Sequence, residues 1–187
     1  MRYVIIVDMQ KDFVTGVLGS KEAQEAAKFI ETELPKYKDE NTALIFTQDT
    51  HYEDTYLDTV EGQKLPVPHC ILGTDGWDIL DELIAASEGF YKPSVVPFCA
   101  EGGRVYKETF GSLDLVNLLY HLDSCGETVD EIVVMGVCTD ICVISNAILL
   151  KTNYPEVPIT VNSACCAGVT PEKHEAALEV MRSCQID

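Results

Sequence analysis

Short runs of consecutive apolar residues that end at a polar residue are the feature that most limits how this chain can fold. They occupy residues 3–7, 43–47 and 131–135, and the first two lead into Asp8 and Asp49. A run without apolar–polar alternation is typical of a strand buried on both faces, and such strands form parallel sheets that helices cover on both sides.

Amphipathic helical patterns separate these runs. Ser20, Ser112 and Thr170 stand just before three of the patterns, where a hydroxyl side chain caps a helix by accepting an amide hydrogen bond. With a further strand at 158–161, the alternation of strand and helix predicts an α/β protein with three layers, α/β/α, around a mainly parallel central sheet. No repeat, low-complexity tract or linker interrupts the pattern, so we expect a single domain over residues 1–187.

The connecting segments are predicted as follows. Residues 9–16 and 89–103 carry loop patterns, and 50–75 is a long irregular stretch with two of the four histidines, which favours a functional role. Asp75 is expected to cap a helix. A short strand is expected over 104–107.

Composition narrows the classes of partner. The net charge of −18 argues against nucleic acid and anionic membranes. No apolar run is long enough to span a bilayer, and the first strand is entered by Tyr3, which leaves no room for a signal peptide. The eight cysteines are therefore expected to be reduced thiols in a cytoplasmic protein.

Chemically complementary residues follow the predicted strands. Asp8, Asp49, Lys107 and the turn at Gly136 each stand where an apolar run stops. Ligands of open α/β sheets bind at the carboxyl ends of the strands, so we expect these positions to form one site. The turn also places Cys142 in the first turn of a helix, whose dipole favours a thiolate nucleophile. The alternative is that Cys142 is a buried small residue.

Motifs along nearly the whole chain, from residue 3 to about 181, resemble those of the isochorismatase-like cysteine hydrolases, the superfamily that contains the nicotinamidases. The motifs are Val7-Asp8-Met9-Gln10-x-Asp12-Phe13, Thr47-Gln48-Asp49-x-His51, Pro68-His69-Cys70-x-x-Gly73-Thr74, Tyr106-Lys107, Gly136-Val137-Cys138-Thr139-Asp140-Ile141-Cys142-Val143, Asn162-Ser163-Ala164 and His174-x-x-Ala177-Leu178. The resemblance implies an isochorismatase-like, Rossmann-like fold.

The resemblance also implies a catalytic trio of Asp8, Lys107 and Cys142. Cys142 would attack a carboxamide carbon, Asp8 would pass the thiol proton to the departing ammonia, and Lys107 would supply a fixed positive charge. The amides of Cys138 and Cys142 would hold the oxyanion, and the peptide bond before Cys138 would be cis. Lys92 is the alternative lysine; Lys107 is preferred because a helix with the family's Asp-Leu pattern follows it directly.

Asp49, His51 and His69 would bind a divalent metal by the same resemblance. One carboxylate and two imidazoles suit zinc first, with manganese and iron(II) as alternatives. Phe13 and Val137 are the expected contacts of the substrate.

The predicted function is that of a metal-bearing amidase of nicotinamidase type, which hydrolyses nicotinamide or a related small carboxamide through a cysteine thioester. The alternative is another amidase of the superfamily that acts on a carbamoyl or ureido compound, and a non-enzymatic binding protein is a third hypothesis. The expected partner is a small-molecule amide, and we expect a homo-oligomer.

Overall fold

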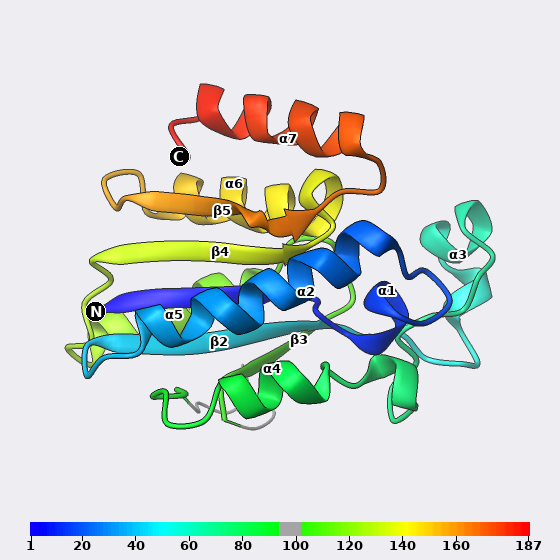
Figure 1. Ribbon diagram of the computed structural model, residues 1–187, viewed down its shortest axis with the longest axis horizontal. Helices are drawn as coiled ribbons and strands as arrows, with labels where there is room; N and C mark the ends of the chain where they lie inside the picture. Colours follow the sequence, from blue (N-terminus) through cyan, green and yellow to red (C-terminus); the bar gives the residue numbers. More distant parts are fainter. Residues whose placement is uncertain (94–101) are drawn as a thin grey trace.

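A parallel sheet forms the centre of the protein. The computed structural model describes residues 1–93 and 102–187 (Figure 1), so the predicted loop over 89–103 lies partly outside the described residues. Within the described part, five parallel strands take the order β3-β2-β1-β4-β5. The strands are β1 (Arg2–Val7), β2 (Thr42–Asp49), β3 (Arg104–Lys107), β4 (Glu131–Val137) and β5 (Ile159–Ala167). The predicted parallel sheet is confirmed, and β5 runs several residues beyond the predicted strand.

Helices cover both faces of the sheet (Figure 1). One face carries α2 (Lys21–Glu33) and α4 (Asp81–Ala86), and the other carries α5 (Leu113–Ser124), α6 (Ile144–Asn153) and α7 (Pro171–Ser183). Alternate side chains of β1 enter the two apolar cores: Tyr3, Ile5 and Val7 pack with α5, α6 and α7, and Val4 and Ile6 pack with α2 and α4. The three-layer α/β/α prediction is confirmed.

The predicted helix starts are confirmed where a hydroxyl residue precedes the pattern. Ser20, Ser112 and Thr170 each accept a hydrogen bond from the amide three residues further on. The prediction of a plain loop over 9–16 is wrong, because the one-turn helix α1 (Lys11–Val14) lies there. The irregular stretch 50–75 contains the short helix α3 (Val60–Lys64).

The helix predicted to start at a capping Asp75 is also wrong. Residues Asp75–Trp77 form a 3₁₀ turn, and α4 begins only at Asp81. The backbones of Gln10 and Ile79 pair in an antiparallel bridge, and the Leu80 amide donates to the Met9 carbonyl. This pairing with a distant segment, which periodicity does not reveal, holds residues 79–80 out of the helix.

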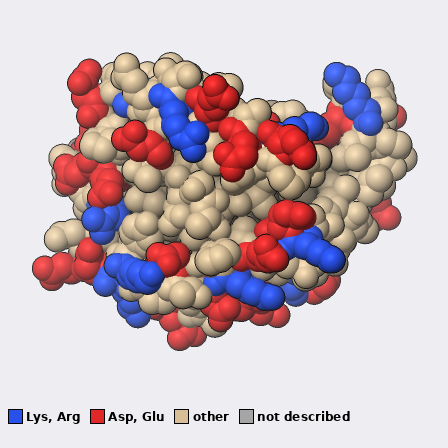
Figure 2. All heavy atoms as spheres, turned by 45° about the horizontal axis from the view of Figure 1, so that its top comes forward, with Lys and Arg blue, Asp and Glu red and all other residues tan. Residues whose placement is uncertain are grey.

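The charged surface agrees with the composition. Among the described residues on the face drawn in Figure 2, Lys and Arg side chains are scattered between Asp and Glu side chains and form no continuous basic stripe. A nucleic-acid-binding surface usually has such a stripe. In the described residues, no helix has the length and the apolar character that crossing a membrane requires.

Gly136 shapes the end of β4. Its φ is +122°, and a Cβ built at this position would lie 2.1 Å from the Val7 carbonyl oxygen of the neighbouring strand. Only glycine allows this close approach and this backbone conformation together. β1 and β4 therefore come together directly beside Asp8 and the turn that follows.

We expect Gly136→Ala to lower the free energy of unfolding by at least about 3 kcal/mol, because backbone strain and a backbone clash add. The matched control is Gly126→Ala, since Gly126 also has a positive φ, +94°, but no atom lies within 4 Å of a Cβ there. We expect the control to lose only about 1 kcal/mol. Urea denaturation measures both; equal losses would contradict the clash argument.

Candidate active site

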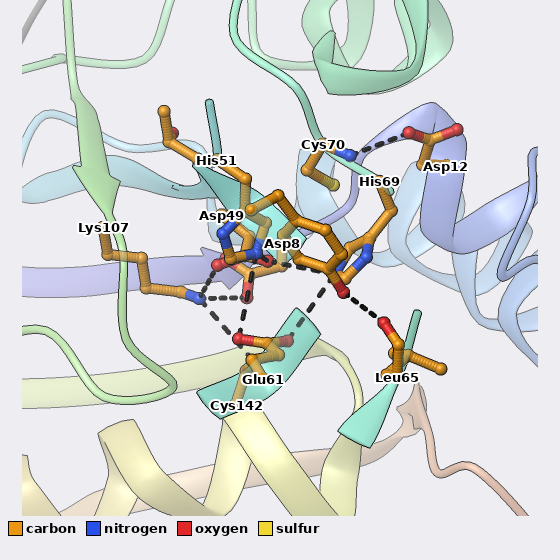
Figure 3. Close-up of polar contacts among 12 residues, drawn as sticks. Asp8, Asp12, Asp49, His51, Glu61, Leu65, His69, Cys70, Lys107 and Cys142 are labelled. Atoms are coloured by element: carbon orange, nitrogen blue, oxygen red, sulfur yellow. Dashed lines mark hydrogen bonds and ion pairs between the residues drawn. The ribbon is translucent and has the colours of Figure 1, made fainter. Parts of the chain in front are cut away.

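The carboxyl ends of the strands bring four predicted positions to one edge of the sheet. Asp8 follows β1, Asp49 ends β2, Lys107 ends β3, and Gly136 leads into the turn after β4. All strands run parallel, so residues far apart in the chain lie together at this edge. Figure 3 shows Asp8, Asp49, Lys107 and Cys142 gathered there.

Lys107 lies at the centre of the polar cluster. Its Nζ is 2.6 Å from Asp8 Oδ2 and 3.2 Å from Asp49 Oδ1, and it donates to Cys142 Sγ at 3.6 Å. Its side chain is buried. Burial alone would lower the pKa of Lys107, but Asp8, Cys142 and Asp49 raise it well above its usual value, so the lysine stays charged. The rival Lys92 donates instead to Ser87 at 2.7 Å.

Asp8 and Cys142 both contact the Lys107 ammonium. Burial raises the pKa of the Asp8 carboxyl, which the Lys107 charge and a 2.6 Å hydrogen bond from Thr47 Oγ1 partly offset. Burial and the Asp8 carboxylate raise the pKa of the Cys142 thiol well above its usual value. Burial therefore opposes the thiolate that the helix start and the Lys107 charge favour.

The turn after β4 differs from a simple helix start. The peptide bond Val137–Cys138 is cis, as the resemblance implied. Residues Thr139–Val143 form a π-helical turn in which the Val143 amide donates to the Cys138 carbonyl, and α6 begins only at Ile144. Cys142 thus lies in the wide turn that precedes the α-helix.

A cavity of about 330 Å³ opens above Cys142. A volume of that size is at the lower end of small-molecule sites. The polar lining residues Asp49, Glu61 and His69 face a largely apolar wall. The predicted substrate contacts Phe13 and Val137 and the predicted oxyanion-hole residue Cys138 line the cavity, together with Leu18, Leu65, Phe110, Ile141 and Val169.

The three predicted metal ligands converge beside this cavity, and a fourth residue joins them. Ligand atoms of Asp49, His51, Glu61 and His69 all lie within 4.8 Å of one another. His51 Nε2 and His69 Nε2 lie 3.0 and 3.6 Å from Asp49 Oδ2, and 3.9 and 3.7 Å from the oxygens of Glu61 (Figure 3). Two imidazoles and two carboxylates are a donor set for zinc, manganese or iron(II), so the residues fit a divalent metal.

Neighbouring groups orient these ligand candidates. His69 Nδ1 donates to the Val67 carbonyl at 2.9 Å, which orients the ring so that Nε2 faces Asp49. Gln10 accepts from the Asp49 amide at 2.8 Å and donates to the Asp49 carbonyl at 2.9 Å. Asp12 accepts from the Cys70 amide at 2.8 Å and so holds the segment next to His69.

Glu61 was missed because no spacing rule connects it with Asp-x-His. It lies in the first turn of the five-residue helix α3, where an acid is also favoured by the helix dipole alone. The available signal was its position, ten residues after His51, inside the irregular stretch predicted to be functional.

A buried thiol, acid and amine lie at the carboxyl edge of a parallel sheet, with histidines and acids beside them, and form a candidate hydrolase site. Residues 2–186 match the family model described as the isochorismatase domain, and the chain belongs to this family.

Three known proteins show how near the similarity is. The chain is 30% identical over 197 residues to the nicotinamidase/pyrazinamidase of Mycobacterium tuberculosis, covering 100% of this chain and 97% of that protein. The crystal structure of the pyrazinamidase/nicotinamidase of Streptococcus mutans is similar with a TM-score of 0.74 at 27% identity, covering 100% of both chains. The pyrazinamidase of Pyrococcus horikoshii in complex with zinc has a TM-score of 0.74 at 23% identity, covering 100% of this chain and 97% of that one.

Proposed function

We propose that this member of the isochorismatase family, a hydrolase acting on non-peptide C–N bonds, is a nicotinamidase-type amidase that converts nicotinamide to nicotinate and ammonia. The observation that carries the proposal is Lys107 Nζ lying 2.6 Å from Asp8 and 3.6 Å from the Cys142 sulfur, beneath a cavity sized for a small molecule. The activity named for the Mycobacterium tuberculosis relative supports it.

Acylation begins with transfer of the Cys142 thiol proton to Asp8. Cys142 Sγ attacks the carboxamide carbon while its proton passes to Asp8, which the Lys107 ammonium keeps close by. Asp8 then gives the proton to the amide nitrogen, the C–N bond breaks, ammonia leaves, and a thioester remains on Cys142. The amides of Cys138 and Cys142 hold the oxyanion of the tetrahedral intermediate.

Deacylation reuses the same carboxylate. Asp8 takes a proton from a water molecule that attacks the thioester carbon, the C–S bond breaks, and the sulfur recovers a proton as the acid leaves. Lys107 remains charged throughout, because Asp8, Asp49 and Cys142 surround it in every state.

Asp49, His51, His69 and Glu61 would hold a divalent metal, zinc being the first candidate since a structural neighbour has zinc. A bound metal would supply a Lewis-acidic position for the ring nitrogen of the substrate. Phe13, whose ring lies 5.3 Å from that of His69, packs against the substrate ring at this end of the cavity.

The metal assignment is tested by metal analysis of purified variants. We expect Asp49→Ala and His51→Ala to lose at least about 90% of the bound metal, and Glu61→Gln to weaken metal binding by roughly ten- to a hundredfold. His121→Ala is the control, because His121 lies on α5 and contacts Cys125 instead of the four ligand candidates. Unchanged metal content in the Asp49 and His51 variants would overturn the ligand assignment.

The Leu65 side chain is the observation that favours the alternative function, an amidase acting on a carbamoyl or ureido compound. It lines the cavity with an aliphatic wall, which also suits a carbamoyl or ureido compound without an aromatic ring. Ammonia release from nicotinamide, pyrazinamide and N-carbamoyl amino acids, measured side by side, distinguishes the two. Preferred release from the pyridine and pyrazine amides supports the proposal, and preference for the carbamoyl compounds would replace it with the alternative.

A further inference from the structure

One buried polar side chain connects the turn that carries Cys142 with the loop that forms a wall of the cavity. Asn146 lies on α6, four residues after Cys142, and its side chain is fully buried. Its Nδ2 donates to the Cys142 carbonyl at 2.8 Å and to the Phe110 carbonyl at 3.0 Å, and its Oδ1 accepts from the Ser112 amide at 2.9 Å. Among the described residues, the side-chain hydrogen bonds of Asn146 thus fall on these two segments.

The loop that Asn146 holds bears directly on the cavity. Phe110 lines the cavity and is 47% exposed, so about half of this residue remains open to solvent. The loop follows Lys107 at the end of β3 and ends at Ser112, the cap of α5. At Gly111 a Cβ would lie 3.3 Å from the Ser145 carbonyl oxygen, so the loop backbone rests closely on the start of α6.

We propose that Asn146 is a positioning residue that sets the Phe110 wall of the cavity at a fixed distance from Cys142. Removing its side chain removes the buried hydrogen bonds that it makes with the Phe110 and Cys142 carbonyls and the Ser112 amide. The loop then moves toward water, and the cavity opens on that side. The expected effect of Asn146 on the kinetics rests on the proposed function. Its effect on access of reagents to Cys142 does not depend on which substrate the enzyme uses.

Asn153 offers a matched control on the same helix. Its Nδ2 also donates to the carbonyl four residues earlier, in this case the Leu149 carbonyl at 2.8 Å. Its Oδ1 accepts a hydrogen bond from Tyr120 Oη of α5 at 3.0 Å. It lies at the far end of α6 from Cys142. Asn153→Ala therefore removes hydrogen bonds of the same donor and acceptor pattern, at a more exposed position, without touching the cavity wall.

The experiment measures alkylation of Cys142 by peptide mass spectrometry, with bulky N-phenylmaleimide and with small iodoacetamide. The measured ratio is the rate with N-phenylmaleimide divided by the rate with iodoacetamide. We expect Asn146→Ala and the nearly isosteric Asn146→Asp to raise this ratio about tenfold, and Asn153→Ala to leave it unchanged. Phe110→Ala should raise the ratio by itself, and adding Asn146→Ala should then change it less than twofold, since both act on one wall.

Two results would overturn the inference: an unchanged ratio in both Asn146 variants, or an equal rise in Asn146→Ala and Asn153→Ala, which would mean general loosening. In the ammonia assay, the Asn146 variants should raise the KM for nicotinamide more than they lower kcat. If wild-type protein released no ammonia from nicotinamide, the proposed function would fail, while the alkylation ratio would still decide the role of Asn146.

Discussion

Cys142→Ala is expected to lower amide hydrolysis by at least about ten-thousandfold, because among the described residues no other sulfur has a hydrogen bond with Lys107. Ammonia release under saturating nicotinamide measures the loss. The fold should persist, since alanine fits where the thiol is buried and the ion pair between Lys107 and Asp8 remains.

Cys138→Ala is the matched control for this variant. Cys138 lies in the same turn and lines the same cavity, but the proposal uses only its backbone amide, which alanine retains. We expect its kcat to stay within about threefold of wild type. Activity that survives in Cys142→Ala but disappears in Cys138→Ala would move the nucleophile to the first cysteine of the turn.

Asp8→Asn is expected to lower kcat about a thousandfold, because an amide of the same shape cannot carry the proton from sulfur to nitrogen. Single-turnover experiments with nicotinamide should show that formation of the thioester itself is slow. Thr47 would still donate to the side-chain oxygen at this position, so the variant should keep its local geometry.

Asp12→Asn makes the same chemical change within the same motif. The Asp12 carboxylate accepts a hydrogen bond from the Cys70 amide, a role that the amide oxygen of asparagine also fills. We therefore expect activity within about threefold of wild type. An Asp8→Asn variant with more than a tenth of wild-type activity would show that another group moves the proton.

The residues at the strand ends are the part of the candidate site that the sequence predicted. Asp8, Asp49 and Lys107 each close an apolar run, and in a parallel sheet such closing residues share one edge whatever the strand order. This is why three residues spread over nearly a hundred positions of the sequence could be grouped before the fold was known. The same rule says nothing about side chains that reach the edge from loops.

Glu61 and Asn146 are the cases that the pattern did not reveal. Glu61 reaches His51 and His69 from a short helix inside an irregular stretch, and Asn146 finds its partners in a loop more than thirty positions away. A glutamate in a first turn and an asparagine in an amphipathic helix have ordinary local explanations. Only the packing of separate segments gives them these partners.

The amino-acid sequence by itself determined the parallel three-layer architecture, the helix caps and the strand-end residues, because the period of apolar residues and local capping act over a few neighbouring positions. Tertiary structure decided the buried surroundings of Cys142, the break before α4 and the partners of Glu61 and Asn146. Each of these depends on burial or on contact between distant segments, and neither quantity exists until the chain has folded.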